Sequence, residues 1–552
     1  MKILKYSLFA LSAVLLMFLT VQCDVIDEGK LDNPNAVSPA NVDPDFLLNN
    51  IQLSARGVYS ASASLGAELT RMRYMFGSNY NNAYTSQSFN GLYQNTYSSL
   101  FIDVQNLLPT AEERDLFFHA GIAKTLQAYG MITMVDMYGD MPFAEALDPS
   151  NFNPNLDDGQ GIYQAAISLL DEAIADLQNE NRRAFPSDDL YFSNLTGAEK
   201  VAAWVRTANT IKMKAYLNTN SQSEFFALAN SGNIISEPEH NFTFNYGLSD
   251  VNPDARHPLY GANYDDLAGA YMSVGYMNML LNDKDELDPR MRYYFYRQST
   301  SDTDDFNENR CINEFPPVHF DGNDPWCFPG GNGEGDGWWG RDHLINDGIP
   351  PDRGLRTTFG VYPVGGNFDS DQGASVEKGD GLAGAGIEPI LMSFGSWFMI
   401  AEAEIRFNSN TVAAKEALEE AVKQSLNTVA NFGSSLADGT GFEITDVEVD
   451  SYWAVVESRV DGAANNQVLR NVMKENYFAL WPNGYEAYNA MRRTGLPDRQ
   501  DNIQPTRTPS PGTWYRTLLY PANMVERNSN VSQKSSVGEG PFWDQGLGDF
   551  NF

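Results

Sequence analysis

Two blocks of amphipathic helical sequence, separated by a long stretch without a regular period, constrain the fold of this 552-residue chain most strongly. Residues 46–240 and 391–500 carry apolar residues at helical spacing, whereas residues 241–390 are rich in glycine, proline, asparagine and aspartate. Each amphipathic helix must bury its apolar face, so the two blocks predict a mainly α fold. We expect them to form a scaffold and the irregular stretch, which is also rich in Trp and Tyr, to form the binding face.

The helical segments follow one another in pairs. Between residues 162 and 177 the apolar side chains fall on one helical face, at Ile162, Ala166, Leu169, Leu170, Ala173 and Leu177. Thr110 and Glu113 match a T-x-x-E capping box, which predicts that a helix begins there. Helix pairs joined by short turns are typical of tetratricopeptide-like repeats, and the pairing rather than a fixed period carries this prediction.

The first 23 residues predict export. Lys2 and Lys5 precede the apolar run "YSLFALSAVLLMFLTV", which is short for a membrane span and ends at Cys23. A cysteine at this junction is typical of a bacterial lipoprotein, in which a lipid on that cysteine anchors the chain. Gln22 departs from the small residue usual before it, and an ordinary secreted protein is the alternative. We expect residues 1–22 to be a signal peptide and residues 23–45 an acidic flexible tether.

Net charge excludes some classes of partner. The formal charge of the chain is −35 at pH 7, from 72 acidic and 37 basic side chains. Nucleic acids and anionic membrane surfaces are bound by clustered Lys and Arg, so neither is expected as a partner. This acidity also favours a neutral ligand over a polyanion, unless Arg71, Arg73 and Arg341 supply positive charge locally.

Two cysteines remain after Cys23, and they lie 16 positions apart. In an exported protein Cys311 and Cys327 are expected to form one disulfide, with two buried thiols as the alternative. Their spacing fits no zinc motif, and the five histidines are scattered.

The segment "GNGEGDGWWGRDH" at 331–343 allows two interpretations. Gly335, Gly337 and Gly340 spell the G-x-G-x-x-G of a dinucleotide-binding turn. Such a turn must follow a strand and open a helix, but the residues before it do not read as a strand and Pro350 and Pro351 stop a helix soon after it. No cofactor is therefore expected at this turn.

Carbohydrate recognition fits the same segment better. An indole face matches the C–H face of a sugar ring, and planar polar groups match its hydroxyls. The candidate ligand-binding residues here are Trp338, Trp339, Arg341, Asp342 and Trp326, and we expect one of the two adjacent tryptophans to be core and the other exposed. A second candidate segment, residues 73–94, alternates tyrosines with amides. From it we select Tyr80, Asn81 and Tyr84, although for each residue taken alone an ordinary role in the core or in a solvated loop is favoured.

Motifs for catalysis are missing from the sequence. It contains no G-x-S-x-G, H-E-x-x-H or C-x-x-C. Glu402 and Glu404 are two residues apart, which places them on different faces of a helix, so they are not expected to act together. The acidic segments 301–310 and 368–373 do not fit the twelve-residue calcium loop, and no metal site is predicted.

Several segments, in this order, resemble the SusD-like (RagB-like) outer-membrane lipoproteins of Bacteroidetes glycan-uptake systems. The segments that carry the resemblance are "CDVIDEGKLDNPN" (23–35), "YGDMPFAEAL" (138–147), "IYQAAISLLDEAIADL" (162–177), "WVRTANTIKMKAYL" (204–217), "LDPRMRYY" (287–294), "FMIAEAEIRF" (398–407), "YEAYNAMRRTGLPD" (485–498) and "YPANMVERNSNV" (520–531).

The resemblance implies one SusD-like fold over residues 46–552, in which tetratricopeptide-type helix pairs support a loop-rich ligand-binding insertion at 241–390 and residues 501–552 wrap the surface. It also implies lipidation at Cys23, exposure on the cell surface, capture of an oligosaccharide and delivery to a SusC-like TonB-dependent transporter, without catalysis. A neutral glycan such as a β-glucan is favoured. The alternatives are a peptide-binding member of the same family and a surface glycoside hydrolase or lyase. Arg492 and Arg493 are expected to form ion pairs of the scaffold and are kept out of the site.

Overall fold

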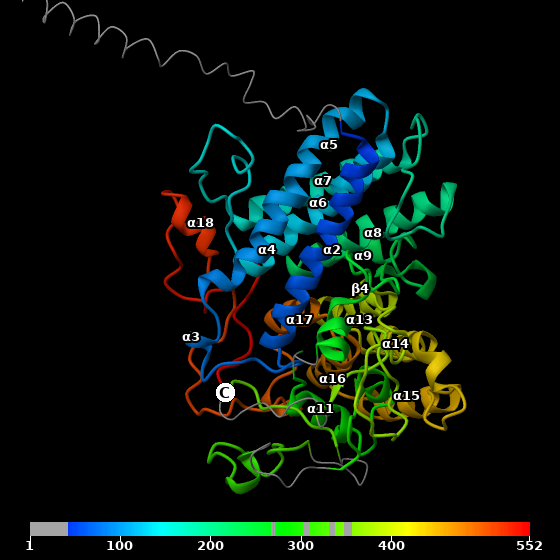
Figure 1. The fold of residues 1–552 in the computed structure, drawn as a ribbon, viewed down its shortest axis with the longest axis vertical. Helices are drawn as coiled ribbons and strands as arrows, with labels where there is room; N and C mark the ends of the chain where they lie inside the picture. The colour runs from blue at the N-terminus through cyan, green and yellow to red at the C-terminus, as the bar shows by residue number, and fades with distance from the viewer. Residues whose placement is uncertain (1–41, 267–268, 270, 302–309, 330–336, 347–355) are drawn as a thin grey trace, which may run out of the picture.

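The structure is a computed structural model that describes residues 42–266, 269, 271–301, 310–329, 337–346 and 356–552. The predicted leader, Cys23 and nearly all of the predicted tether lie outside these residues. Two helical blocks occupy the top and the lower right of Figure 1, loops occupy the bottom, and the C-terminal segment runs along one side. The prediction of a mainly α architecture is confirmed.

The first block packs its consecutive helices against one another. Helix α6 lies against α2, α5, α7 and α8, so almost every one of its side chains is buried. The apolar stripe predicted for residues 162–177 lies on α7, where five of its six side chains are buried and Leu169 is half-buried. The elements of this block are α2 (Pro44–Leu69), α3 (Tyr80–Ala83), η3 (Ser86–Phe89), α4 (Asn90–Asn95), η4 (Thr96–Phe101), α5 (Ile102–Glu113), α6 (Phe117–Tyr138), α7 (Gly159–Gln178), α8 (Gly197–Asn218), α9 (Gln222–Ala229) and η5 (Pro238–His240).

The helix start predicted at Thr110 is wrong. Thr110 lies in the last turn of α5, which ends at Glu113, and α6 begins only at Phe117. Asp115 between them has a positive φ of 55°, which breaks the helix at that point. The capping pattern fails here because α5 continues directly from η4 and α4 and needs no N-terminal cap at this position.

The second block repeats this arrangement. Each of its helices packs against the next, and α13 also contacts α8 while α17 contacts α2, so the two blocks join into one scaffold. The elements are α13 (Ser393–Asn408), α14 (Thr411–Ala437), α15 (Asp446–Val460), α16 (Asn465–Ala479), α17 (Gly484–Thr494) and η8 (Arg499–Asp501). Helix α18 (Ala522–Arg527) belongs to the C-terminal segment and contacts η3 of the first block.

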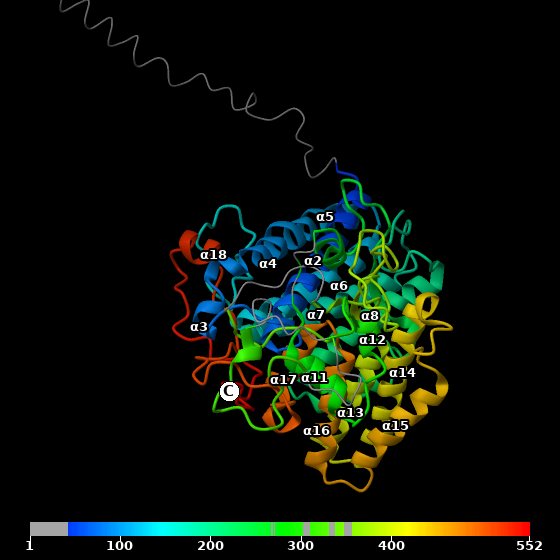
Figure 2. The same cartoon turned by 60° about the horizontal axis from the view of Figure 1, so that its bottom comes forward.

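The described residues between 241 and 390 contain little regular structure, and many of them lie at the end of the molecule that comes forward in Figure 2. Strand β1 (Phe242–Asn245) pairs antiparallel with β4 (Ile387–Leu391), which brings the two ends of the segment together. Strands β2 (Phe295–Tyr296) and β3 (Thr358–Phe359) form a second antiparallel pair. The remaining elements are α10 (Pro258–Tyr260), η6 (Gly261–Asp265), α11 (Val274–Asn282), α12 (Met291–Tyr294) and η7 (Arg310–Asn313).

Buried ion pairs fasten these loops to the second block. Arg290, just after Asp288 in the "LDPRMRYY" segment, binds that carboxylate at 2.7 Å and the Tyr452 hydroxyl of α15 at 2.6 Å. The same hydroxyl donates to Glu475 of α16 at 2.7 Å. An unpaired charge at this depth would be costly, so the network fixes both partners in place.

A buried carboxylate links the first block to the chain's C-terminal segment. Asp136 on α6 accepts hydrogen bonds from Tyr485 at 2.6 Å, Asn489 at 2.8 Å and Trp543 at 2.9 Å, and also from Tyr163. Residues 501–552 therefore lie along the first block and insert aromatic side chains into its core, among them Trp514, Tyr515, Trp543 and Phe550.

The two adjacent arginines of α17 have different partners. Arg493 forms the predicted ion pair, with Glu402 at 2.7 Å. Arg492 instead donates to the backbone carbonyls of Asp136 and Arg516 and to the side-chain amide oxygen of Asn489, so the ion pair predicted for it is corrected to a set of neutral acceptors.

Candidate functional site

Three short extended segments, distant in sequence, run side by side at one surface. Backbone bridges join Arg73 to Met272, Ser273 to Arg341, and Phe76 to Ile345. The beginning of candidate segment 73–94 is thereby brought against the end of candidate segment 331–343.

Aromatic rings and one arginine cover this small assembly. Tyr74, Tyr271 and Trp339 pack together, with Phe328 and Ile345 against them. The Arg341 guanidinium lies 4.8 Å from the centre of the Tyr271 ring and 5.7 Å from that of Tyr74. We call Phe76, Trp326 and Arg341, together with the rings beneath Arg341, the aromatic face. Phe76 is 65% exposed, and Arg341 is half-buried.

The expectation that one of the two adjacent tryptophans is exposed is wrong. Trp338 has no exposed surface and Trp339 has 4%. Trp338 belongs to the core below the loops, where the Arg297 guanidinium lies 4.5 Å from its ring. Trp339 is held by reciprocal bonds with Thr357, whose hydroxyl accepts from the Trp339 amide at 2.7 Å and whose own amide donates to the Trp339 carbonyl at 2.9 Å. Both rings support the aromatic face from below.

Two more of the predicted ligand-binding residues are buried. Asp342 accepts a hydrogen bond from the Gln504 amide at 2.7 Å, and burial raises the pKa of its carboxyl above the ordinary value. Tyr80 is fully buried, with its hydroxyl 3.2 Å from both Arg71 and His343. Neither side chain is open to a ligand in this structure. Asp342 connects the loops to Gln504 of the C-terminal segment, and the Tyr80 hydroxyl contacts Arg71 and His343.

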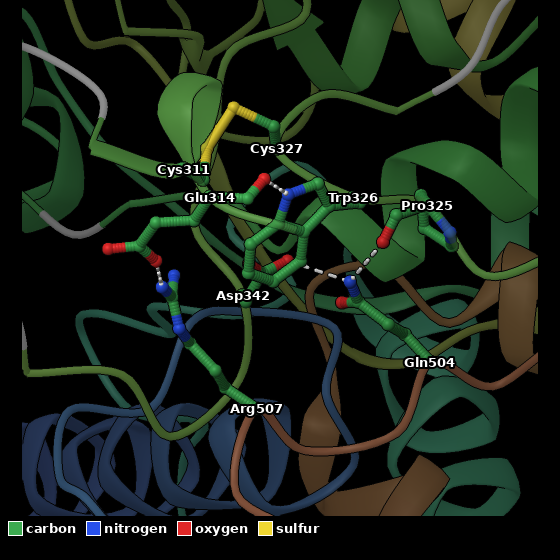
Figure 3. The surroundings of a disulfide bond; sticks show 8 residues. All are labelled: Cys311, Glu314, Pro325, Trp326, Cys327, Asp342, Gln504 and Arg507. Carbon is green, nitrogen blue, oxygen red and sulfur yellow. Dashed lines mark hydrogen bonds and ion pairs between the residues drawn. A yellow bond between two sulfur atoms is a disulfide. The ribbon is translucent and has the colours of Figure 1, made fainter. Parts of the chain in front are cut away.

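Trp326 is the tryptophan of the predicted set that keeps a partly open ring. It adjoins the disulfide between Cys311 and Cys327, which confirms the predicted pairing. Its indole N–H donates to the Glu314 carbonyl at 3.2 Å, and the Arg507 guanidinium lies 4.6 Å from the ring centre while pairing with the Glu314 carboxylate (Figure 3). The ring is therefore fixed in orientation on an irregular loop.

The disulfide closes a lobe, residues 311–327, that is tied to the C-terminal segment. Arg499 pairs with Asp324, and His319 lies 2.8 Å from the Thr506 carbonyl. Gln504 donates to the Pro325 carbonyl at 2.9 Å (Figure 3). Phe315 projects from this lobe with 95% of its surface exposed. A lobe so tied presents its aromatic residues with little loss of freedom on binding.

The remaining two predicted residues lie on the turn that follows Phe76. Asn81 is exposed. Tyr84 is half-buried and donates its hydroxyl to Glu68, which also pairs with Arg73 at 2.8 Å. Asn81 is thus available to a ligand, whereas Tyr84 mainly fixes the turn.

Arg341 is one of several arginines at this surface, with Arg356 near the same Tyr271 ring and Arg507 at Trp326. Of the other two arginines that the sequence suggested, Arg73 is neutralised by Glu68, and Arg71 donates to the carbonyls of Gln504 at 2.6 Å and Phe550 at 3.0 Å. Two of the three arginines that the sequence suggested for binding a polyanion, Arg71 and Arg73, therefore have partners inside the protein.

The carboxylates considered for catalysis have separate partners. Burial by itself would raise the pKa of Glu402, but Arg493 and Arg406 outweigh it and hold the pKa below its usual value. Glu404 accepts a hydrogen bond from Asn408 at 2.9 Å. Across the described ranges no three His, Cys, Asp or Glu side chains are grouped to hold a metal ion.

Phe76 and Phe315 are exposed at this surface but were absent from the predicted set. Phe76 lies in the same aromatic-rich segment as Tyr80, and Phe315 lies beside Pro316 and Pro317 within the disulfide loop. The sequence signal that identifies both residues is an aromatic side chain next to glycine or proline, because such positions occur in turns where a side chain has few neighbours.

The fold and this surface together place the chain in a class of helical-repeat proteins whose loops carry an aromatic face. Two family models match the chain: "Starch-binding associating with outer membrane" over residues 34–312, and "Susd and RagB outer membrane lipoprotein" over residues 390–540. The chain belongs to the SusD/RagB family.

Solved structures agree on the fold. A SusD/RagB family protein from Bacteroides thetaiotaomicron is 20% identical with a TM-score of 0.64, over 91% of this chain and 99% of its own. A SusD homologue from Bacteroides fragilis is 15% identical with a TM-score of 0.63, over 92% and 100%. A chitin-binding SusD homologue from Flavobacterium johnsoniae is 17% identical with a TM-score of 0.58, over 92% and 98%. A search of curated proteins finds no match.

The family is described as one of outer-membrane lipoproteins, and its members are known as binding proteins. Among the helices in the described part of the chain, none combines the length and apolar character needed to cross a bilayer.

Proposed function

We propose that this protein is a non-catalytic lipoprotein, anchored through Cys23 to the outer membrane and facing the cell exterior. It captures a neutral glycan and passes it to a SusC-like TonB-dependent transporter. The observation that carries the proposal is the fixed Trp326 ring, which the Trp326–Phe328 bridge joins to the aromatic cluster beneath half-buried Arg341, in a SusD/RagB chain. Rings that are held in place stack on sugar faces, and the guanidinium and Asn81 suit the hydroxyl rim.

A neutral polysaccharide, such as a β-glucan, is favoured. The chain carries −35 formal charges, and Arg71 and Arg73 are both engaged within the protein. A polyanion would be repelled by this field with few cations to compensate. The chitin-binding homologue, which shares the fold, binds a polysaccharide of this neutral kind.

The test is binding of the chain without residues 1–23 to a panel of neutral and acidic polysaccharides on native affinity gels, with product assays in the same samples. Retardation by a neutral glycan without new reducing ends is expected. New reducing ends would instead make the protein a hydrolase or lyase, and binding of peptides alone would make it a peptide-capturing member of the family.

A matched pair of variants tests the surface itself. Trp326 and Trp397 are both half-buried, and each donates its indole N–H to a backbone carbonyl, but Trp397 lies on α13 of the scaffold. Trp326→Ala is expected to weaken glycan binding by about tenfold or more, which is about 1.4 kcal/mol. Trp397→Ala should leave affinity unchanged, and equal losses in both variants would refute the assignment.

A further inference from the structure

A cavity lies where the loop-rich segment joins the helical scaffold, and none of its lining residues belongs to the aromatic face. Its walls come from β4, the first turns of α13, the turn that connects α16 to α17, and the facing sides of α8 and α17. The cavity volume is about 40 Å³. At about 10–15 Å³ for each water, it accommodates roughly three waters and is too small for a sugar ring.

Three polar side chains that line this cavity have no hydrogen-bond partner among the described residues. They are the Tyr362 hydroxyl, the Trp481 indole N–H and the Ser396 hydroxyl. Each of these residues is at most 1% exposed, so bulk water does not reach them. Buried polar groups in native proteins are nearly always hydrogen-bonded to protein or to ordered water. Three such groups around one cavity therefore indicate a polar guest.

The two aromatic donors cannot turn elsewhere to find partners. The Trp481 ring is stacked on Tyr276 at 5.5 Å and meets Phe295 at 4.7 Å. The Tyr362 ring is held between Tyr294 at 5.8 Å and Phe432 at 5.6 Å. Reorienting either ring would disrupt close-packed neighbours, so the guest must come to the donors.

Charged groups at the cavity are already paired. Lys214 binds Glu486 at 2.6 Å and lies 3.8 Å from the Tyr485 ring centre, and Arg493 binds Glu402 at 2.7 Å. A lining without net unpaired charge offers an ion no compensation for its lost hydration. The guest is therefore neutral and must supply acceptor oxygens to the indole N–H.

We propose that this cavity is a binding site for a cluster of about three ordered waters, held by Tyr362, Trp481 and Ser396. The cluster takes the place of direct side-chain contacts between β4 and helices α13 and α17. Ordered water therefore fills part of the boundary between the loop-rich half and the scaffold.

Tyr362→Phe and Ser396→Ala in the mature chain remove one hydroxyl each with little change in volume, so they give opposite signs for a hydrated and a dry cavity. If waters occupy it, each variant loses a hydrogen bond and its melting temperature falls by about 1–2 °C. If the cavity is dry, each variant removes an unsatisfied polar group and the melting temperature is unchanged or rises, which would overturn the proposal. Tyr294→Phe is the control, since its hydroxyl donates to the Phe478 carbonyl at 3.2 Å and its loss should lower the melting temperature in either case.

A high-resolution crystal structure provides the second readout, which does not depend on folding of the variants. Water peaks within hydrogen-bonding distance of the three groups are expected, together with no xenon binding under pressure. Xenon in the cavity would show that it is dry, as in apolar cavities, and density for a larger organic molecule would equally refute a water site.

Discussion

The first helical block and the disulfide lobe both hold aromatic side chains in fixed positions, but they do so by different means. In the helical block, Asp136 gathers Tyr163, Tyr485 and Trp543 around a single buried carboxylate. In the lobe, the orientation of Trp326 depends on a disulfide, an ion pair and a cation over its ring. A helical core distributes its constraints over many contacts, whereas the lobe concentrates them in a few removable ones. Loss of a central scaffold contact should therefore destabilise the whole fold, whereas loss of a lobe contact should change the lobe alone.

The largest effect is expected for Asp136→Ala. The change leaves four buried donors without their acceptor, and we expect the free energy of unfolding to fall by about 5 kcal/mol. Denaturant unfolding followed by circular dichroism measures this fall. Asp148→Ala is the control, because that carboxylate is exposed and accepts hydrogen bonds from the amide and the hydroxyl of neighbouring Ser150. Similar losses in the two variants would contradict the view of Asp136 as the central link.

The second largest loss of stability is expected for Trp338→Ala. Trp338 is fully buried, so its truncation leaves a cavity and is expected to cost about 4 kcal/mol of stability. Trp326→Ala should cost at most about 1 kcal/mol while it weakens glycan binding. Thermal unfolding and affinity gels of the two variants distinguish a tryptophan that supports the fold from one that contacts the glycan. A Trp338→Ala protein of normal stability would mean that its burial has been misassigned.

A smaller effect is expected from pH at the junction of β4 and α2. Burial raises the pKa of Glu388 to about 7, against opposing contributions from Ser60, Tyr246 and Arg56. His257, 3.9 Å away, stays neutral because burial lowers its pKa to about 3. In the unfolded chain Glu388 ionises near pH 4.5. The folded state therefore holds the proton longer, and stability is lost as pH rises from 4.5 through 7.

The variant Glu388→Gln removes this titration. Between pH 5 and pH 8.5 the native protein should lose about 2–3 kcal/mol of stability relative to the variant. Denaturant midpoints at the two pH values measure the difference, and using the difference cancels other titrating groups such as Asp501, whose pKa burial raises to about 6. Parallel pH profiles for the two proteins would show that Glu388 is ionised when folded.

The smallest effect on global stability is expected for the double change Cys311→Ser with Cys327→Ser. The lobe can open without unfolding the helices, so we expect the main transition to change by less than about 1 kcal/mol. Glycan affinity should nevertheless fall about tenfold, because Trp326 is no longer held. Isothermal titration and thermal melts of one preparation report both quantities. A large drop in melting temperature with unchanged affinity would reverse the comparison between scaffold and lobe.

The distinction between scaffold and lobe also explains what could be predicted. The stripe from Ile162 to Leu177 specified one face of α7, because helical periodicity is written in adjacent residues. The pairing of Cys311 with Cys327 was predictable because no other cysteine remained after the predicted lipidation site. The start at Thr110 was not, because a local capping pattern cannot reveal that a helix arrives from upstream.

The sequence alone determined the helical scaffold, its interruption by a loop-rich segment and the family, since these depend on local period and on the order of motifs. Only the tertiary structure decided which aromatic residues reach the surface. Adjacent Trp338 and Trp339 are both buried, and Phe76 is exposed, because loop burial depends on distant partners such as Arg297 and Thr357. Likewise, Trp326 is oriented by Arg507, which lies almost two hundred residues further along the chain. A loop carries no repeating pattern that records which face is covered, so contacts made across the fold settle it.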